Sequence, residues 1–222
     1  MHSDEPSQGP PLSRGEHWLL ETAVHAAIPL RVLNSPDLEI AFNKRGHGLS
    51  PTAIASTLHA LASRGDIETI DDHHEDALVT VSAAEIEREL ADPDGERRYY
   101  YRLTPPGGAR WEHASRADWG RFVRHNWSTQ EDRLLVAANA LFLRRFAEIF
   151  RETLAEDGMS IVDERWDVVQ PWKATRWKIL PQGTSLRIRS TKSGARAKKR
   201  TARLRLQPLM IWYESPFTSR SL

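Results

Sequence analysis

The sequence of 222 residues contains no cysteine, which excludes disulfide bonds, thiolate metal sites and cysteine nucleophiles. It also lacks any apolar run that approaches the roughly 18 residues of a membrane span. The polar, proline-rich first residues lack the apolar segment of a signal peptide. We therefore expect a soluble, cytoplasmic protein in which residues 1–14 are disordered.

Acidic residues are scarce at the C-terminal end of the chain. Residues 165–222 hold 2 Asp and Glu against 14 Lys and Arg, whereas residues 1–164 hold 28 against 17. The formal net charge of +1 therefore conceals one acidic and one basic part. Such an asymmetry indicates either that the two parts attract each other or that the basic part meets an external anion.

Catalytic and cofactor motifs are missing as well. We find no P-loop, no His-Glu-x-x-His and no nucleophile turn around a serine. The run DDHHED at residues 71–76 has metal-ligand residue types, but neighbouring residues of an extended chain point to opposite sides. We predict a solvated loop at this run, and no enzyme activity, metal or cofactor for the chain.

The N-terminal part carries signals for three successive helices. Apolar spacing predicts a helix over residues 17–28, and Ser35 is placed to cap a short helix over 36–43. Ser50 followed by Pro51 predicts the start of a third helix, which Gly65 ends. The succession is typical of a helix-turn-helix arrangement.

A β-hairpin and further short elements are predicted after these helices. Residues 67–81 have the pattern of two strands around a polar tip, and the amphipathic run 82–90 predicts a helix. The aromatic run 97–103 then predicts a strand. In the following TPPGGARWE, Thr104 is a natural N-cap, so the two glycines fall inside a helix and not in a phosphate-binding loop. They are expected to let the helix of Trp111 pack closely against the strands.

The run from Leu49 to Ile67, together with the segment YRLTP at residues 101–105, resembles winged helix-turn-helix regulators of the PadR and MarR kind. In those proteins a Y-x-L-T-x-x-G segment is the last wing strand entering the next helix. The resemblance covers about residues 15–125, with a helix inserted between the wing strands around residues 82–91. It implies a DNA-binding transcriptional regulator whose third helix contacts DNA through Thr52, Ser56, His59 and Arg64.

Charge keeps a second interpretation open for this domain. Residues 15–125 hold 12 basic against 18 acidic side chains, a balance that repels phosphate. Winged helices also serve as modules that bind other proteins. The alternative is therefore a non-enzymatic interaction module that binds acidic or partner protein surfaces.

A long helix and a small sheet are predicted for the second domain, residues 128–222. A capping box of Ser128 and Glu131 and a stop at Gly158 predict a helix over residues 129–156. In the regulators that the chain resembles, a helix at this position commonly forms a homodimer, which we expect here. Strand-like runs follow from Met159, so the fold class is α+β: a winged helix, a long helix and an antiparallel sheet.

Two arginine-rich runs, SLRIRST and TARLRLQ, are predicted to pair as a hairpin. In that register Arg187 lies opposite Arg205 and Arg189 opposite Arg203, so an anion is expected over them. One interpretation is a phosphate surface for nucleic acid, with Trp166, Trp172 and Trp177 as stacking faces. The alternatives are that the arginines dock on the acidic N-terminal part of the same chain, or that they simply solvate an exposed face of the sheet. The loop between the runs adds Lys198, Lys199 and Arg200.

The run PWKATRWK gives a weaker indication of a ligand pocket. It would consist of Trp172, Lys173, Arg176 and Trp177, with cation-π character. The alternative is that one tryptophan anchors the sheet to the long helix and that the basic residues merely flank it.

Overall fold

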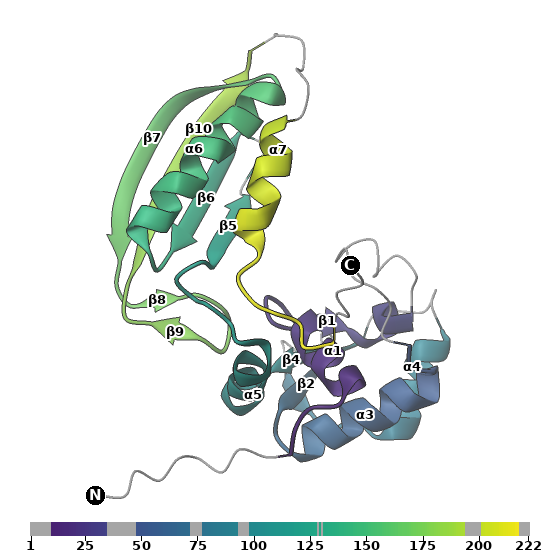
Figure 1. Cartoon of the computed structure of the whole chain (residues 1–222). Coiled ribbons are helices and arrows are strands. Elements are labelled where there is room, and N and C mark those ends of the chain that lie inside the picture. The colour runs from purple at the N-terminus through teal and green to yellow at the C-terminus, as the bar shows by residue number, and fades with distance from the viewer. Residues whose placement is uncertain are drawn as a thin grey trace, which may run out of the picture. The chain divides into compact units, whose positions relative to one another are not determined.

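The structure is a computed structural model that describes residues 10–34, 48–71, 77–92, 98–127, 129, 131–193 and 201–217 (Figure 1). The chain divides into two compact units. Unit 1 comprises residues 1–115, 175–178 and 215–222, and unit 2 comprises residues 116–174 and 179–214. Each unit combines helices with antiparallel strands, so the α+β class is confirmed. In the described ranges, the structure contains no helix with the length and apolar character needed to cross a membrane.

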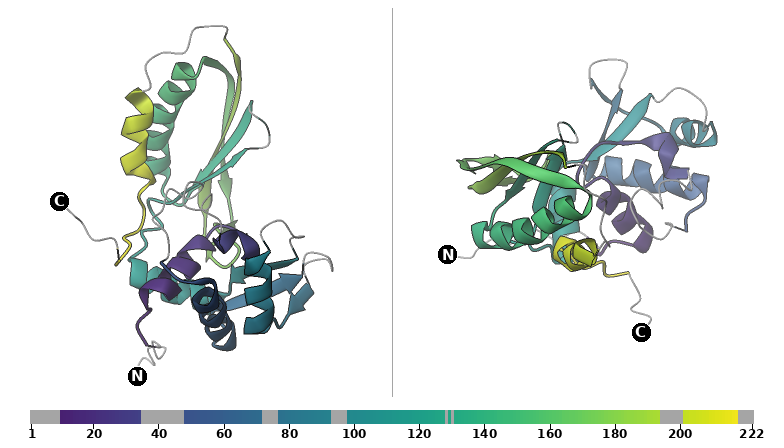
Figure 2. Two further views of the ribbon diagram at one scale, coloured as in Figure 1. Left: turned by 90° about the vertical axis from the view of Figure 1, so that its right-hand side faces the viewer. Right: turned by 90° about the horizontal axis from the view of Figure 1, so that it is seen from above.

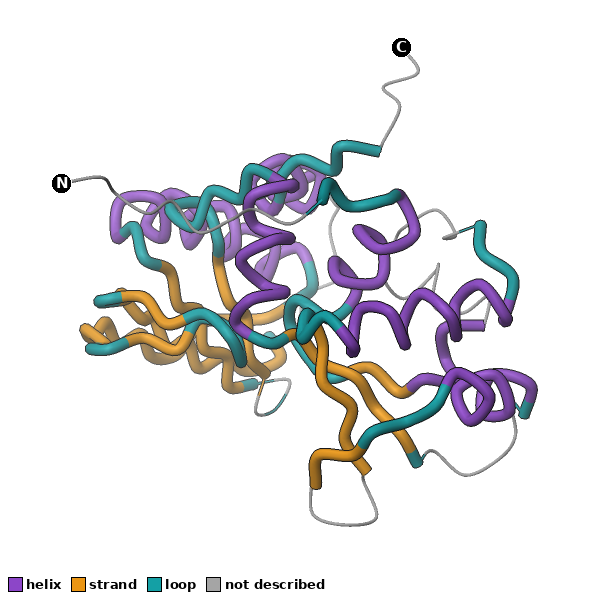
Figure 3. Tube along the Cα trace, turned by 90° about the horizontal axis from the view of Figure 1, so that it is seen from below, coloured by secondary structure: helices purple, strands orange, loops and turns teal. Residues whose placement is uncertain are grey.

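Unit 1 combines short helices with one antiparallel sheet. Its strands follow the order β1-β4-β2-β3, and Figure 3 shows them grouped beside the helices. The elements are α1 (Arg14–Thr22), β1 (Ile28–Pro29), the 3-10 helix η1 (Leu30–Asn34), α3 (Pro51–Ser63), β2 (Ile67–Asp71), β3 (Ala77–Val79), α4 (Ala83–Ala91), β4 (Tyr99–Leu103) and α5 (Pro105–Ser115).

Local capping signals fix most helix ends in unit 1. The Ser50 side chain accepts a hydrogen bond from the backbone N–H of Ala53, 3.2 Å away, and Gly65 adopts φ +76° just after α3. Thr104 Oγ1 accepts from the N–H of Gly107 at 3.2 Å, which confirms the predicted start of α5. The predicted helix 36–43 and the tip 72–76 lie outside the described residues.

The first helix differs from its prediction at both ends. It begins at Arg14 and not at residue 17, because Ser13 and Glu16 form a capping box before the predicted start. It ends at Thr22, and Ile28 instead starts a strand that pairs with Tyr101. The ordered fold therefore starts at or before Ser13, inside the segment predicted to be disordered.

Two glycines on α5 permit close packing, which confirms the prediction for Gly107 beside the start of β2, whereas Gly108 packs on Trp177 and not on the strands. A Cβ at Gly107 would overlap the carbonyl group of Asp66 and lie 2.8 Å from its Cα. A Cβ at Gly108 would lie 2.7 Å from Cζ3 of Trp177. Trp177 is thereby held in unit 1, where its Nε1 donates to the carbonyl of Val24 at 3.2 Å. Trp177 therefore packs on α5, and the predicted alternative for the PWKATRWK run, a tryptophan that anchors the sheet to the long helix, does not describe it.

Unit 2 is a four-stranded antiparallel sheet with helices on one face. The strand order is β5-β6-β10-β7, and Figure 2 shows α6 and α7 on the same side of the sheet. The elements are β5 (Val123–Trp127), β6 (Asp132–Ala137), α6 (Ala140–Glu156), β7 (Met159–Val169), β8 (Trp172–Lys173), β9 (Ile179–Leu180), β10 (Gly183–Lys192), α7 (Thr201–Leu206) and the 3-10 helix η3 (Gln207–Met210). Residues 116–125, assigned to the first domain from the sequence, lie in unit 2, where β5 pairs with β6.

The predicted helix over residues 129–156 is wrong in its first part. Residues 132–137 form the strand β6, which pairs with β5 on one side and β10 on the other. Leu135 and Ala137 point into the core at strand spacing. The helix starts only at Ala140, where Asn139 is the N-cap and accepts from the N–H of Phe142 at 3.0 Å. The predicted stop at Gly158 is confirmed by its φ of +74°.

The second arginine-rich run is a helix and not a strand. Residues 201–206 form α7, in which Ala202 and Leu206, four positions apart, are buried against the core of α6. The carboxylate of Glu156 accepts hydrogen bonds from the N–H groups of Thr201 and Ala202, both at 2.9 Å. This cap from a distant residue stabilises a helix where the local alternation of Arg and Leu favoured a strand.

One histidine in the core of unit 2 makes stability depend on pH. Burial, with a smaller contribution from Arg133, lowers the pKa of His125 to about 4 from the ordinary 6.5. Between these values the unfolded chain binds more protons than the folded chain, so stability falls as the pH decreases from 6.5 towards 4. We expect His125→Gln to lose less stability than the parent between about pH 7.5 and about pH 5 in urea unfolding. Equal losses in both chains would contradict this cause.

Candidate functional site

The outer side of α3 carries three of the residues predicted to contact DNA. Thr52, Ser56 and His59 are all exposed on this helix. Beside it, α3, β2 and β3 enclose a groove of about 400 Å³, which His59, Glu68 and Leu78 help to line. The groove belongs entirely to unit 1. Leu78, one of the lining side chains, is 63% exposed.

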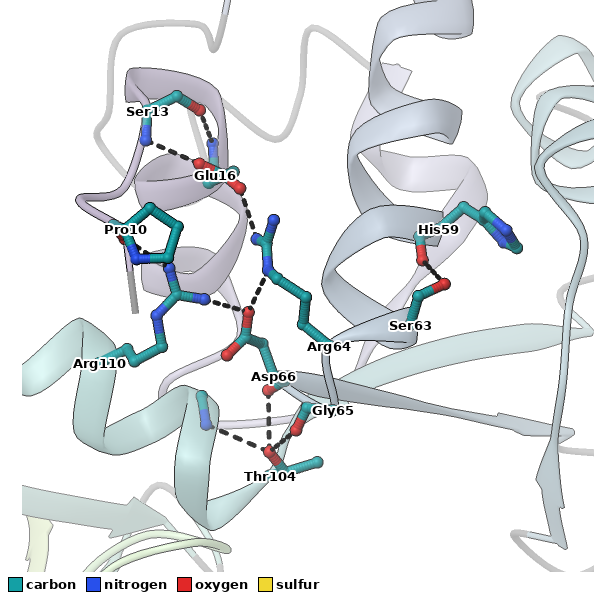
Figure 4. A network of polar contacts seen from close by, with 11 residues as sticks. Pro10, Ser13, Glu16, His59, Ser63, Arg64, Gly65, Asp66, Thr104 and Arg110 are labelled. Atoms are coloured by element: carbon teal, nitrogen blue, oxygen red, sulfur yellow. Dashed lines mark hydrogen bonds and ion pairs between the residues drawn. The ribbon is translucent and has the colours of Figure 1, made fainter. Parts of the chain in front are cut away.

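Carboxylates restrict what this helix offers to a phosphate. The hydroxyl of Thr52 donates to Glu87 of α4, and Ser56 donates to the carbonyl of Ala53 at 3.1 Å. His59 points away from the arginine cluster described next (Figure 4).

Arg64, the fourth predicted contact, is held in an ion-pair network (Figure 4). Its guanidinium binds Glu16 of α1 and, through Nε, Asp66 at 3.0 Å. Burial alone would raise the pKa of Glu16, but hydrogen bonds from Ser13 and Arg64 outweigh burial and lower it. Arg64 therefore joins α1 to the end of α3, and two carboxylates already engage the guanidinium that was predicted to contact DNA.

Asp66 is the centre of the same network. Its side chain is 3% exposed and also binds the guanidinium of Arg110 on α5. Arg110 in turn donates to the carbonyl of Pro10 at 2.9 Å. One buried carboxylate thus connects the end of α3, the start of β2 and α5.

The predicted arginine hairpin does not exist. Arg203 and Arg205 lie on α7, and Arg205 pairs with Glu152 of α6 at 2.5 Å. Arg187 and Arg189 do lie on a strand, β10, as predicted. The three basic loop residues Lys198, Lys199 and Arg200 lie outside the described residues.

Arg187 nevertheless faces an arginine. In the ladder between β10 and β7 it lies directly opposite Arg165, and on its other side it faces Leu134 of β6. All three belong to the face of the sheet that is opposite α6, because Leu186 and Ile188 on the intervening positions are buried in the core. Like charges opposite each other in a ladder are unfavourable by roughly 0.2–1 kcal/mol.

This open face of unit 2 is hollowed, with a volume of about 650 Å³. We call it the sheet hollow. Basic side chains surround it, apolar side chains of β6 form part of its lining, and one carboxylate lies at its edge. The residues used below are Arg124, Leu134, Val136, Arg165, Lys173 and Arg187.

Two of the basic groups at the sheet hollow are already engaged. Arg124 of β5 donates to Asn126 Oδ1 at 3.2 Å and to the carbonyl of Lys173 at 3.0 Å. Arg165 pairs with Asp167 at 3.0 Å. Within the described part of the chain, the guanidinium of Arg187 and the ammonium of Lys173 have no such partner.

The predicted PWKATRWK pocket is split between the two units. Trp172 and Lys173 line the sheet hollow in unit 2, whereas Arg176 and Trp177 belong to unit 1. Arg187 and Lys173 were predicted in separate candidate sites, and Arg124 and Arg165 were not predicted. The alternation of side chains along β5 and β7 indicates which residues are exposed. Only the strand order shows that Arg124 and Arg165 lie on the same sheet as β10.

None of the three tryptophans offers an open stacking face at the sheet hollow. Trp172 is 4% exposed and stacks on Phe122 with centroids 6.0 Å apart. Trp166 packs against the core on the helix side of the sheet, beneath Arg144. Trp177 contacts Trp111 in unit 1, with centroids 6.3 Å apart. The nucleic-acid stacking expected at these residues has no support in their positions.

The helix expected to form a homodimer uses its apolar face inside unit 2. Phe146, Ala147 and Phe150 of α6 are buried together with Leu186 and Ile188 of the sheet. Leu141 is 78% exposed and is not part of that core.

No family model, no curated protein and no solved structure matches this chain. The geometry of the two units is therefore what any functional proposal has to rest on.

Proposed function

We propose that this chain is a DNA-binding transcriptional regulator of the winged-helix type, without catalytic activity, whose unit 2 carries an anion-binding surface. Its α3 would enter the major groove, and β2 with β3 would form the wing. A homodimer belongs to the proposal, since a pair of α3 helices would contact two half-sites. The expected dimer contact lies on α6, where the exposed Leu141 is the side chain to test.

The observation that supports the proposal is the order of elements around α3. A helix, α1, is followed by the short strand β1, which pairs with β4. Then α3 leads through Gly65 directly into the antiparallel strands β2 and β3. From α3 onward the described elements follow the order expected from the resemblance to PadR and MarR regulators, with α4 inserted before the last strand. The strand β1 was not expected, and the second predicted helix lies outside the described residues. The polar side of α3 remains outside the core.

Salt-dependent DNA binding tests the proposal. We expect the full chain to bind a fluorescent random-sequence duplex at about 50 mM salt and to lose at least about tenfold in affinity by about 200 mM. Ser56→Glu with His59→Glu should weaken binding at least about tenfold, because both carboxylates would face phosphates. The matched control, Ala109→Glu with His113→Glu, adds the same charge on exposed positions of α5 and should bind like the parent.

The second candidate, a protein-docking module, is favoured by the acidic residues around α3. Glu87 binds Thr52, Glu68 lines the groove, and Arg64 is engaged by two carboxylates. A docking module would not bind the duplex at either salt concentration. That result would overturn the DNA-binding proposal and leave the groove beside α3 as the surface to test with proteins.

A further inference from the structure

We propose that the sheet hollow of unit 2 binds a small organic anion, a molecule with an apolar body and one carboxylate or a comparable anionic group. The inference deepens the anion-binding part of the proposed function, on which it rests. It concerns unit 2 alone and requires no DNA.

The anionic group is inferred from the unpartnered cations. Arg187 is exposed at the centre of the sheet, between β6 and β7, and Lys173 is exposed on β8. Both line the hollow, and neither side chain has a partner within the described part of the chain. A guanidinium offers paired N–H donors that match a carboxylate, so Arg187 is the residue expected to bind the anion directly.

Neighbouring charges add to this preference. Arg165 lies opposite Arg187 in the ladder. Its side chain pairs with Asp167 but is still 74% exposed. Arg124 contributes a third guanidinium from β5. Four basic side chains and one carboxylate line the hollow, so the local potential favours an anion.

The apolar body is inferred from the surface between the cations. Leu134 and Val136 of β6 lie on the same face as Arg187 and line the hollow. Val136 is flanked by Arg124 on β5, and Leu134 by Arg187 on β10. Val136 is already buried, at 5% exposed, whereas Leu134 is partly exposed and Pro171, also in the lining, is exposed. An anion that consisted of phosphate alone would leave Leu134 and Pro171 uncovered, whereas a ligand with an apolar part would cover them.

Size and aromatic content favour a small molecule over a nucleic acid. The hollow has a volume of about 650 Å³, within the roughly 300–1,000 Å³ of small-molecule sites. Single-stranded nucleic acids are bound on basic surfaces with exposed aromatic rings. The aromatic residue in the described lining is Trp172, which is 4% exposed and covered by Phe122.

A matched pair of fluorescent probes tests the proposal with the full chain. The anion is 8-anilinonaphthalene-1-sulfonate, and N-phenyl-1-naphthylamine has the same aromatic body without the sulfonate. We expect the anion to bind at least about tenfold more tightly, as a charge-assisted hydrogen bond implies. Arg187→Gln should weaken binding of the anion at least about fivefold and leave the neutral probe within about twofold.

The neighbouring arginine provides the control. Arg189 is exposed two positions further along the same face of β10, opposite Asp132 and Asp163, and does not line the hollow. Arg189→Gln carries the same loss of charge and should bind both probes like the parent. Circular dichroism and a thermal midpoint within about 2 °C of the parent would establish that each variant is folded. Arg124→Gln is a second variant, on a different strand, and should also weaken binding of the anionic probe.

Three results would overturn the inference. The first is equal affinity for the two probes, which would indicate a merely apolar surface. The second is an equal effect of Arg187→Gln and Arg189→Gln, which would indicate a diffuse charge effect. The third is displacement of the anion by a single-stranded oligonucleotide that itself loses affinity in Arg187→Gln, which would make nucleic acid the occupant. Duplex binding by the variant with Ser56→Glu and His59→Glu is measured separately. The DNA-binding part and the anion-binding part of the proposed function can therefore fail independently.

Discussion

Gly107→Ala is expected to destabilise unit 1 by about 3 kcal/mol, although alanine is the better helix former. The added Cβ would overlap the backbone carbonyl of Asp66, which cannot move like the end of a flexible side chain. That carbonyl accepts hydrogen bonds from the N–H of Thr104 at 3.1 Å and from its hydroxyl at 3.0 Å. Moving α5 away would therefore break contacts at the start of the helix as well.

Urea unfolding of the full chain measures this effect, with hydrogen exchange of the α5 amides to locate it in unit 1. Ala109→Gly is the matched control, because Ala109 is exposed on the same helix. It should cost about 1 kcal/mol through helix propensity alone. If Gly107→Ala were instead as stable as the parent or more stable, close packing would not be the reason for glycine at this position.

This glycine also marks how far the sequence can predict the fold. Thr104 and Pro105 predict the start of α5 because a cap and a first-turn proline are local signals, and the same is true of Ser50 before α3. The need for close packing at Gly107 was predictable from two glycines inside a helix. The partner, Asp66, was not, because it depends on how β2 and α5 meet.

The errors in unit 2 occur where distant residues decide the local structure. Residues 132–137 combine helix-compatible and strand-compatible side chains, and β6 forms because β5 and β10 pair with it on both sides. In α7, residues 201–206 alternate Arg and Leu like a strand, but Glu156 caps them and Ala202 finds a buried position. Neither pairing nor cap is visible in a local window.

The candidate site was predictable only where local sequence patterns determine it. Arg187 was identified from alternation on β10, and the expected clash of like charges is present, with Arg165 in place of Arg205. The choice of partner required the strand order, which places β10 between β6 and β7. Lys173 was identified because Trp172 and Trp177 flank it together with Arg176. That it lines the same hollow as Arg187 depends on the fold and is not visible in the sequence.

Asp66→Ala is expected to destabilise unit 1 by about 3 kcal/mol, because it leaves two arginines without their shared carboxylate. The Asp66 side chain is 3% exposed, and Arg64 and Arg110 are 35% and 20% exposed. Removal of one partner from a fully buried pair costs roughly 3–5 kcal/mol, and access of water to both guanidinium groups favours the lower end.

The contrast with an exposed ion pair makes this expectation testable. Asp167→Ala removes the carboxylate from Arg165, whose side chain is 74% exposed, and should change stability by less than about 1 kcal/mol. Both variants are measured by urea unfolding, with hydrogen exchange in α3 and α5 as the local readout for Asp66. An equal small effect for both would mean that α1, α3 and α5 are held by their apolar contacts alone. A large effect for Asp66 alone would mean that the buried carboxylate, through its ion pairs with Arg64 and Arg110, holds the end of α3 against α5.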